Sequence, residues 1–249
     1  MRHFITGLQF LTRLRLIEEK EWSARNFSGS VKFFPLVGAA LGILFALYTY
    51  LILEYLPTLG IHISEVIYAT TMIFLWVFFT GALHCDGFMD TMDGIFSGRD
   101  REKMLVIMKD SRVGANGIVG FVLLVLFKWS LFFEIAQTNQ IVTTVFLMPV
   151  IARFMMVIGI TTFPYARREG LGRYFAEYVT RKTLWIAFIF TIFLVLPFGI
   201  KAYFSLVITG LFTIFFCRYV TRLLGGLTGD VYGAITELSE VIVLLAFLK

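Results

Sequence analysis

Three aspartates, Asp86, Asp90 and Asp93, follow one another at intervals of four and three residues. On an α-helix, which turns by about 100° per residue, this spacing places all three within about 60° of each other on one face. Like charges stacked in this way repel one another unless a cation lies between them. Mg²⁺ is bound by one or two carboxylates together with substrate phosphates. A solvated acidic helix end would explain a single aspartate, but three in register favour a magnesium site for phosphoryl transfer.

A second acidic pair lies near the C-terminus, where Asp230 and Glu237 are seven residues apart and share one helical face. Three roles fit this pair: metal ligation, pairing with a cation inside a membrane, and proton relay. Lys128 and Arg153 are the candidate cations, because each interrupts an apolar segment. We expect Lys128 to form a structural ion pair, whereas Arg153 is also a candidate for substrate binding.

Groups that suit phosphate lie in two further segments. Lys109, Ser111 and Arg112 precede a glycine-containing turn at the start of an apolar segment, and Arg167 belongs to a basic, glycine-bearing loop. Cations and hydroxyls beside a helix start bind phosphate, although basic residues also anchor membrane spans on the cytoplasmic side. His84, close to the aspartates, is a candidate proton acceptor or substrate contact.

The composition predicts a membrane protein. Apolar residues make up 58% of the 249 residues, charged residues only 16%, and the mean hydropathy is +0.83, whereas a soluble domain carries about 25% charged residues. The net charge of +5 therefore concerns membrane sidedness, and we expect no nucleic-acid partner. Cys85 and Cys217 predict no disulfide framework. We expect no covalent catalysis by Cys85, because no third group orients it with its neighbour His84.

Long apolar segments predict an all-α, polytopic transmembrane bundle of about seven spans with short interfacial helices, since each spanning helix needs about 20 mostly apolar residues. The predicted spans are Phe34–Leu56, Ile63–Leu83, Gly114–Ala136, Ile141–Phe163, Thr183–Ile200, Ala202–Tyr219 and Asp230–Leu248. The last is the least apolar, because three carboxylates lie within it. We expect the whole chain, 1–249, to form one domain.

The distribution of Lys and Arg predicts the orientation. The N-terminal tail contains Arg2, Arg13, Arg15, Lys20, Arg25 and Lys32. Further basic clusters follow the second, fourth and sixth spans, whereas the opposite side has only Lys201 and Lys249. The positive-inside rule therefore places the N-terminus and these loops on the cytoplasmic side of an inner membrane. An odd number of spans would leave the C-terminus outside.

Two shorter segments belong to the predicted cytoplasmic face. In the N-terminal segment, 1–33, Phe4, Leu8, Leu11 and Leu14 recur at helical spacing. They predict either a helix in the membrane interface or one packed on the protein's own surface. The segment 84–113 is predicted to be a cytoplasmic loop carrying the acidic motif, with a short amphipathic helix around residues 104–108.

Several motifs, in order along nearly the whole chain, resemble one family, the adenosylcobinamide-GDP ribazoletransferases or cobalamin (5′-phosphate) synthases. They are Phe10-Leu11-Thr12-Arg13, Phe34-Pro35-Leu36-Val37-Gly38, Thr80-Gly81 through His84, Asp86-Gly87, Asp90, Asp93-Gly94, Ile107 through Ala115 with Gly117, and Gly225-Gly226 through Thr228-Gly229-Asp230 to Glu237 and Glu240. Cys85 and Met89 stand where the family more often has aliphatic or small residues.

The resemblance implies a reaction. The family joins α-ribazole, or its 5′-phosphate, to adenosylcobinamide-GDP at the last assembly stage of cobalamin. A ribose hydroxyl attacks the corrin-linked phosphate and GMP leaves, with Mg²⁺ as the expected metal. Both substrates and membrane lipids are the expected partners, and whether the chain forms a homo-oligomer stays open.

The charge pattern and this reaction together suggest residue roles. We expect Asp86, Asp90 and Asp93 to form the metal cluster, with Asp230 and Glu237 completing it or activating the hydroxyl. The residues expected to hold substrate are Lys109, Ser111, Arg112, Arg153 and Arg167, and His84 is expected to act with the carboxylates.

Three other classes fit less well. A CDP-alcohol phosphatidyltransferase has Ala-Arg two residues after Asp-Gly, where this chain has Met89-Asp90. A UbiA-like prenyltransferase uses two separate Asp-rich helices and more spans. A cation- or proton-coupled transporter places its site near the bilayer midplane and shows repeat symmetry, whereas most motif residues here gather at the cytoplasmic face.

Overall fold

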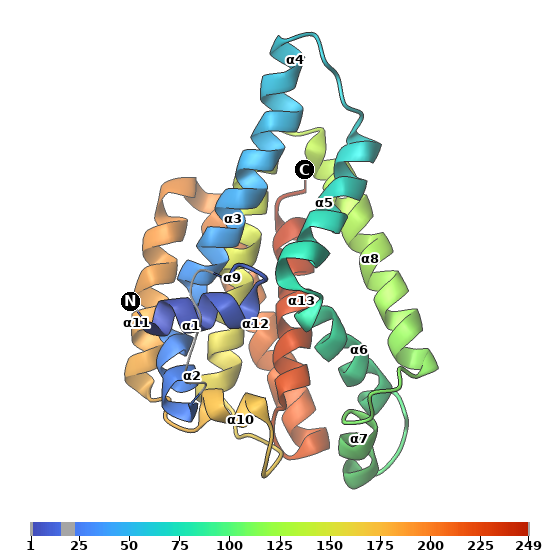
Figure 1. Ribbon diagram of the computed structural model, residues 1–249, viewed down its shortest axis with the longest axis vertical. Coiled ribbons are helices and arrows are strands. Elements are labelled where there is room, and N and C mark those ends of the chain that lie inside the picture. The colour runs from blue at the N-terminus through green and yellow to red at the C-terminus, as the bar shows by residue number, and fades with distance from the viewer. Residues whose placement is uncertain (1, 16–22, 249) are drawn as a thin grey trace.

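The structure, a computed structural model, describes residues 2–15 and 23–248, and these ranges are almost entirely helical (Figure 1). The elements are α1 (Arg2–Leu11), α2 (Ala24–Ser30), η1 (Val31–Phe33), α3 (Phe34–Tyr50), η2 (Leu51–Tyr55), α4 (Leu56–Thr58), α5 (Glu65–Thr80), α6 (Leu83–Ile95), α7 (Arg101–Ile107), α8 (Ala115–Ala136), α9 (Ile141–Thr162), α10 (Leu171–Ala176), α11 (Arg181–Val195), η3 (Leu196–Phe198), α12 (Gly199–Leu224) and α13 (Gly229–Ala246). The all-α prediction is confirmed.

Helix α9 lies at the centre of the bundle, where it packs against α3, α11, α12 and α13. Most of its side chains are buried, because it is apolar on every face. Helix α3 approaches it closely through two glycines. A Cβ atom at Gly38 would lie 2.3 Å from the carbonyl oxygen of Pro149, and one at Gly42 would lie 2.4 Å from that of Phe146. Such small residues let membrane helices pack with their backbones in contact.

Four helical stretches of the described chain are long and apolar enough to cross a membrane: Ala24–Thr58, Ala115–Ala136, Ile141–Thr162 and Arg181–Leu224. A fifth arises if α5 and α6, which are bent by 91° relative to each other, count as one broken span. These stretches indicate a membrane protein, but the predicted number of seven spans is not confirmed.

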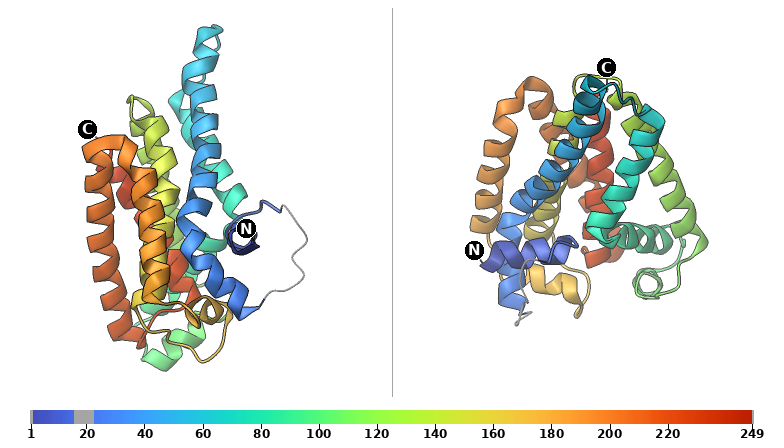
Figure 2. Two further views of the ribbon diagram at one scale, coloured as in Figure 1. Left: turned by 90° about the vertical axis from the view of Figure 1, so that its left-hand side faces the viewer. Right: turned by 45° about the horizontal axis from the view of Figure 1, so that its top comes forward.

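The difference has identifiable causes. Helix α5 has 16 residues and is therefore about 24 Å long, short of the roughly 30 Å hydrocarbon core. Helix α13 contains Asp230, Glu237 and Glu240, which lower its hydropathy. The apolar stretch Arg181–Leu224 covers two of the predicted spans. It is interrupted by η3, where Figure 2 shows the chain turning back between α11 and α12.

The bend between α5 and α6 is built from two consecutive residues in the left-handed region, Gly81 with φ 64° and Ala82 with φ 59°. Glycine adopts this conformation without steric cost, whereas alanine does not. The backbone N–H of Arg13 donates to the carbonyl of Phe79 at 2.8 Å, and the Arg13 guanidinium lies over the Phe78 ring. The bend turns the chain by 91° between α5 and α6. The segment 84–113, predicted as a cytoplasmic loop, is occupied largely by the helices α6 and α7.

The N-terminal helix α1 packs on α2 and α3 and buries Thr6, Gly7, Leu8 and Leu11. The helix therefore packs on the protein's own surface, while its position in the membrane interface stays a prediction. Lys20 and Lys249, which entered the prediction of orientation, lie outside the described residues.

Helix α7, α10 and the start of α13 lie at one end of the molecule, and α4 and the C-terminus lie at the other (Figure 1). Helix α7 matches the predicted short amphipathic helix and is capped by Asp100. Arg101 in α7 donates through Nε to the carbonyl of Leu224 at 2.7 Å, which fixes α7 to the end of α12. The loops before α8 and α10 are therefore gathered at the same end of the bundle (Figure 1).

Candidate active site

Helices α6 and α13 are in contact through glycines. A Cβ atom at Gly87 would lie 2.7 Å from the carbonyl oxygen of Asp230, and one at Gly233 would lie 3.0 Å from that of His84. This contact places the start of α13 beside the first turn of α6. Asp230 and Asp86 both exert an electrostatic effect on Asp90. The two acidic motifs, distant in sequence, thus form one acidic region.

The three aspartates of α6 have different surroundings. Asp86 is exposed, Asp90 is partly buried and Asp93 is only 7% exposed. The Asp93 carboxylate accepts hydrogen bonds from the backbone N–H groups of Gly114 and Gly117, both at 2.7 Å. These groups lie at the start of α8, where N–H donors lack helical partners and where a negative charge is favourable. Asp93 therefore caps α8, while Asp86 and Asp90 remain beside Asp230.

Arg167 joins the acidic region from the loop that follows α9. Its Nη2 lies 2.8 Å from Oδ2 of Asp230, and its Nε is buried without a hydrogen-bond partner among the described residues. Backbone hydrogen bonds of 2.8 Å from Ala166 to Leu227 and from Leu227 to Pro164 fix this loop to the segment before α13. The guanidinium is thus held in place and keeps a donor for an anion.

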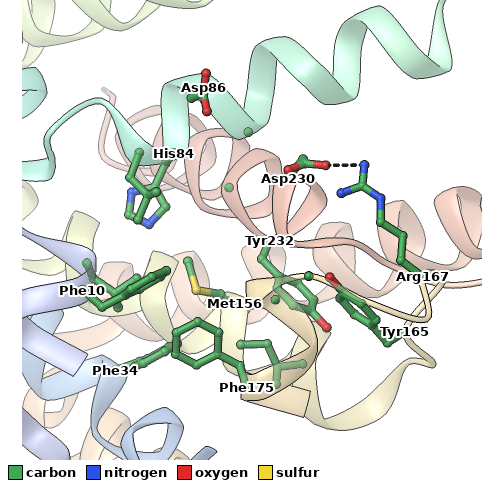
Figure 3. A pocket seen from close by; sticks show the side chains of 18 residues that line it. Phe10, Phe34, His84, Asp86, Met156, Tyr165, Arg167, Phe175, Asp230 and Tyr232 are labelled. Carbon is green, nitrogen blue, oxygen red and sulfur yellow. Dashed lines mark ion pairs between the residues drawn. The ribbon is translucent and has the colours of Figure 1, made fainter. Parts of the chain in front are cut away.

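A cavity of about 290 Å³ opens beside these groups (Figure 3). Its polar lining includes His84, Asp86, Arg167 and Asp230, and its apolar lining includes Phe10, Leu11, Phe34, Met156, Ile160 and Phe175. Two tyrosines, Tyr165 and Tyr232, lie next to Arg167 and Asp230 in Figure 3. Burial raises the pKa of Tyr165, so that its hydroxyl is neutral. The arrangement suits a ligand with one flat apolar part and one anionic part.

Glu237 and Arg153 lie apart from this cavity in a buried ion-pair network. Lys128 Nζ is 2.6 Å from Oε2 of Glu237 and 2.6 Å from Oε2 of Glu240, and Arg153 pairs with Oε1 of Glu240. The four side chains are at most 1% exposed. Trp76 donates through Nε1 to Glu240 at 2.8 Å, and Lys128 Nζ lies 3.7 Å from the centre of the Trp76 ring. Lys128 forms the predicted structural ion pair.

The network touches the cavity at one point. Nδ1 of His84 lies 3.5 Å from Nη2 of Arg153. His84 therefore connects the buried ion pairs with the acidic region. Its neighbour Cys85 is buried and lies 3.8 Å from Oε1 of Glu237, so its thiol points away from the region where a substrate could bind.

Lys109, Ser111 and Arg112 are exposed between α7 and α8. Arg112 makes a two-point contact with its neighbour Asp110, at 3.0 Å from Nε and 2.7 Å from Nη2. These hydrogen bonds hold the pKa of Asp110 at about 2, below its ordinary value. None of the three predicted phosphate-binding residues is among the described residues that line the cavity.

Within the described ranges, no three His, Cys, Asp or Glu side chains come close enough together to enclose a metal ion. The donor set nevertheless suits Mg²⁺, since this ion needs only one or two protein carboxylates and takes its other ligands from water and substrate phosphates. Asp86, Asp90 and Asp230 provide these carboxylates. The metal cluster of Asp86, Asp90, Asp93 and Asp230 that the sequence predicts stays a prediction. In the structure, the Asp93 carboxylate accepts the hydrogen bonds that cap α8.

The sequence did not single out the aromatic wall of the cavity. Phe10 and Phe34 stand within motifs of the family resemblance, but nothing in their spacing connects them with Phe175 or Tyr232. Tyr165 lies two residues before Arg167 in the same loop, and nothing in the sequence predicts a role for it. Their convergence depends on the packing of α1, α3, α10 and α13, which no local pattern reports.

Comparisons with known proteins identify the family. The model of the cobalamin-5-phosphate synthase family matches residues 3–248. Among curated relatives, the adenosylcobinamide-GDP ribazoletransferase of Desulfitobacterium hafniense (strain Y51) is 39% identical over 98% of this chain and 96% of its own. The protein of the same name from Syntrophobacter fumaroxidans is 38% identical over 98% of this chain and 97% of its own. The one from Fusobacterium nucleatum is 32% identical over 100% of this chain and 97% of its own.

No solved structure matches the chain. The resemblance inferred from the motifs is confirmed, because the family model and the relatives cover almost every residue. The chain therefore belongs to the cobalamin-5-phosphate synthase family and is a transferase of cobalamin biosynthesis.

Proposed function

We propose that the protein joins α-ribazole, or α-ribazole 5′-phosphate, to adenosylcobinamide-GDP and releases GMP. In this reaction a ribose hydroxyl oxygen bonds to the corrin-linked phosphorus. The bond from that phosphorus to the oxygen bridging to GMP breaks, and GMP keeps the electron pair while the hydroxyl proton passes to a base. The products are GMP and adenosylcobalamin or its 5′-phosphate. The names of the relatives support this assignment.

The observation that carries the proposal is the meeting of Asp86, Asp90, Asp230 and Arg167 beside a cavity. Phosphoryl transfer needs few covalent partners, but it needs positive charge around the transferring oxygens. Arg167 supplies a fixed cation with a free donor, and one or two of the three carboxylates would hold Mg²⁺ near it. When bound, Mg²⁺ neutralises the charge that develops on the phosphoryl oxygens. The carboxylate that is not engaged with the metal is the candidate base for the hydroxyl proton.

We place this site at the cytoplasmic face of the inner membrane. The proposal rests on the basic loops, which the fold gathers at the same end as α7, α10 and the start of α13 (Figure 1). A charged, nucleotide-linked substrate is then accessible from water, while the apolar helices hold the enzyme in the bilayer. A topology measurement with reporter fusions at the loops before α8 and α10 tests this placement. Reporter signals on the opposite side would contradict it.

The activity test is GMP release by the purified protein in liposomes, supplied with both substrates, with and without Mg²⁺. We expect metal-dependent GMP release that matches cobalamin formation, abolished by a chelator and restored by added Mg²⁺. Asp90→Asn is expected to abolish turnover without impairing membrane insertion. Asp100→Asn, at the exposed N-cap of α7, is the matched control and retains turnover. Turnover by Asp90→Asn at the wild-type rate would exclude the proposed metal site.

A further inference from the structure

The cavity beside the carboxylates has an apolar interior and a polar rim. Phe10, Phe34 and Phe175 come from α1, α3 and α10 and lie together on one side, with Met156 of α9 beside them (Figure 3). Asp86, Asp230 and Arg167 lie on the other side. Binding sites of this kind take a ligand whose apolar part enters the cavity and whose polar part stays at the rim.

His84 adds one polar atom to the apolar side. The residue is 2% exposed, and its Nε2 has no hydrogen-bond partner among the described residues. In Figure 3 its imidazole lies on the side of α6 that faces Phe10 and Met156. A buried polar atom without a partner is costly, so a ligand that satisfies it gains affinity.

The neighbour of His84 determines which kind of partner Nε2 requires. Nδ1 lies 3.5 Å from Nη2 of Arg153, and a guanidinium only donates hydrogen bonds. Nδ1 is therefore the acceptor, and in the neutral ring the proton is on Nε2. The cavity thus presents the His84 Nε2–H donor beside its aromatic wall, and the ligand must supply an acceptor there.

We propose that this cavity binds the aromatic base of the nucleoside substrate, and that His84 Nε2–H donates to the ring nitrogen that carries no sugar. This inference rests on the proposed function. The base of α-ribazole is a benzimidazole, an apolar bicycle whose one nitrogen bears the ribose and whose other nitrogen is an acceptor. It matches both the aromatic wall and the Nε2–H donor of His84.

The position and size of the cavity support the same assignment. Its volume of about 290 Å³ lies at the lower end of the range for small-molecule sites, which suits one bicyclic ring and excludes a corrin ring. With the base inside, the ribose lies at the rim, near Asp86, Asp230 and Arg167. The attacking hydroxyl then meets the phosphate where the carboxylates and the guanidinium are placed. Tyr232, whose hydroxyl is also buried without a partner among the described residues, is available to the sugar.

The test compares α-ribazole with an analogue in which the free ring nitrogen is replaced by C–H, giving an indole riboside of the same shape. GMP release is measured at saturating adenosylcobinamide-GDP, and the KM for each nucleoside is determined. For the wild-type protein we expect the KM to be roughly tenfold lower for α-ribazole, the value of one hydrogen bond. In His84→Phe the two nucleosides are expected to have the same KM. In His84→Gln, which keeps a side-chain N–H donor, part of the preference is expected to remain.

Two phenylalanines of α3 provide a matched pair for the aromatic wall. Phe34 lines the cavity, whereas Phe45 is equally buried and packs against Phe79 instead. Phe34→Leu is expected to raise the KM for α-ribazole several-fold and to leave the KM for adenosylcobinamide-GDP unchanged. Phe45→Leu is expected to change neither.

The outcomes separate this inference from the proposed function. Absence of GMP release by folded wild-type protein contradicts the proposed function itself. GMP release in which His84→Phe still prefers α-ribazole over the indole riboside overturns only the inference, as does a rise in the KM for the corrinoid alone in Phe34→Leu. If His84→Phe does not fold, calorimetric binding of the two nucleosides to the wild-type protein decides, because equal affinities would exclude the ring-nitrogen contact.

Discussion

Replacing Glu240 with Gln tests the role of the buried ion-pair network. The carboxylate accepts hydrogen bonds from Trp76 and Lys128 and pairs with Arg153. In Glu240→Gln, Lys128 keeps Glu237 as a partner, but Arg153 loses its only ion-pair partner among the described residues while remaining fully buried. Breaking a buried pair in this way costs about 3–5 kcal/mol. For a chain of this size that loss lowers Tm by roughly 6–20 °C.

Thermal unfolding in detergent provides the measurement. Cys85 and Cys217 are both buried free thiols, so a dye that becomes fluorescent on reaction with thiols reports their exposure as the protein unfolds. Glu237→Gln is the matched control, because Glu240 still pairs with both cations in that variant. We therefore expect its Tm to lie between those of the wild type and Glu240→Gln.

A double variant makes the test more specific. Arg153→Met together with Glu240→Gln removes one charge of each sign and leaves Lys128 paired with Glu237. We expect it to be more stable than Glu240→Gln alone, with a coupling of about 1–3 kcal/mol between the two sites. A wild-type Tm in Glu240→Gln, or strictly additive losses in the double variant, would refute the argument that ion pairing holds these helices together.

Three further predictions concern the site. Asp93→Ala removes the cap of α8, so we expect a loss of about 1–2 kcal/mol in the free energy of unfolding, measured as a lower Tm. An unchanged Tm would show that the hydrogen bonds from Gly114 and Gly117 to Asp93 are dispensable. Gly87→Ala places a methyl group 2.7 Å from the Asp230 carbonyl, which separates α6 from α13. It is expected to reduce kcat at least tenfold, whereas full activity would mean that the helices adjust. Arg167→Ala is expected to lower kcat/KM by about 100-fold, which corresponds to a charged contact of about 2–3 kcal/mol. Arg112→Ala is expected to change kcat/KM less than threefold, because the Arg112 guanidinium is exposed and paired with Asp110. Equal losses of kcat/KM in the two variants would show that Arg112 also belongs to the phosphate site.

The acidic motifs could be predicted from the sequence because their information is local. The spacing of Asp86, Asp90 and Asp93 identified a helical face, and the structure has α6 at that place. Helical spacing describes one helix in isolation, however, and does not predict that the Asp93 carboxylate accepts hydrogen bonds from the N–H groups of Gly114 and Gly117 at the start of α8. The prediction that Lys128 forms a structural ion pair was confirmed, since a lone cation in an apolar span requires a partner.

The parts that could not be predicted depend on the path of the chain. Hydropathy identifies apolar helices and separates the spans on either side of Gly199, but it does not report the bend at Gly81 and Ala82, and the predicted number of seven spans stays unconfirmed. The cavity wall joins Phe10, Phe34 and Phe175, whose separations follow no period. Their apolar character was visible in the sequence, but only the packing of three helices makes them one surface.

The buried network also has an electrical consequence. Lys128, Arg153, Glu237 and Glu240 carry two positive and two negative charges, so a voltage across the membrane exerts no net force on the group. A single uncompensated charge crossing the full field changes in energy by about 2.3 kcal/mol per 100 mV. The network of the wild-type protein therefore adds no net charge to the core of the bundle, whereas a variant that lacks one of the four charges leaves one uncompensated charge there.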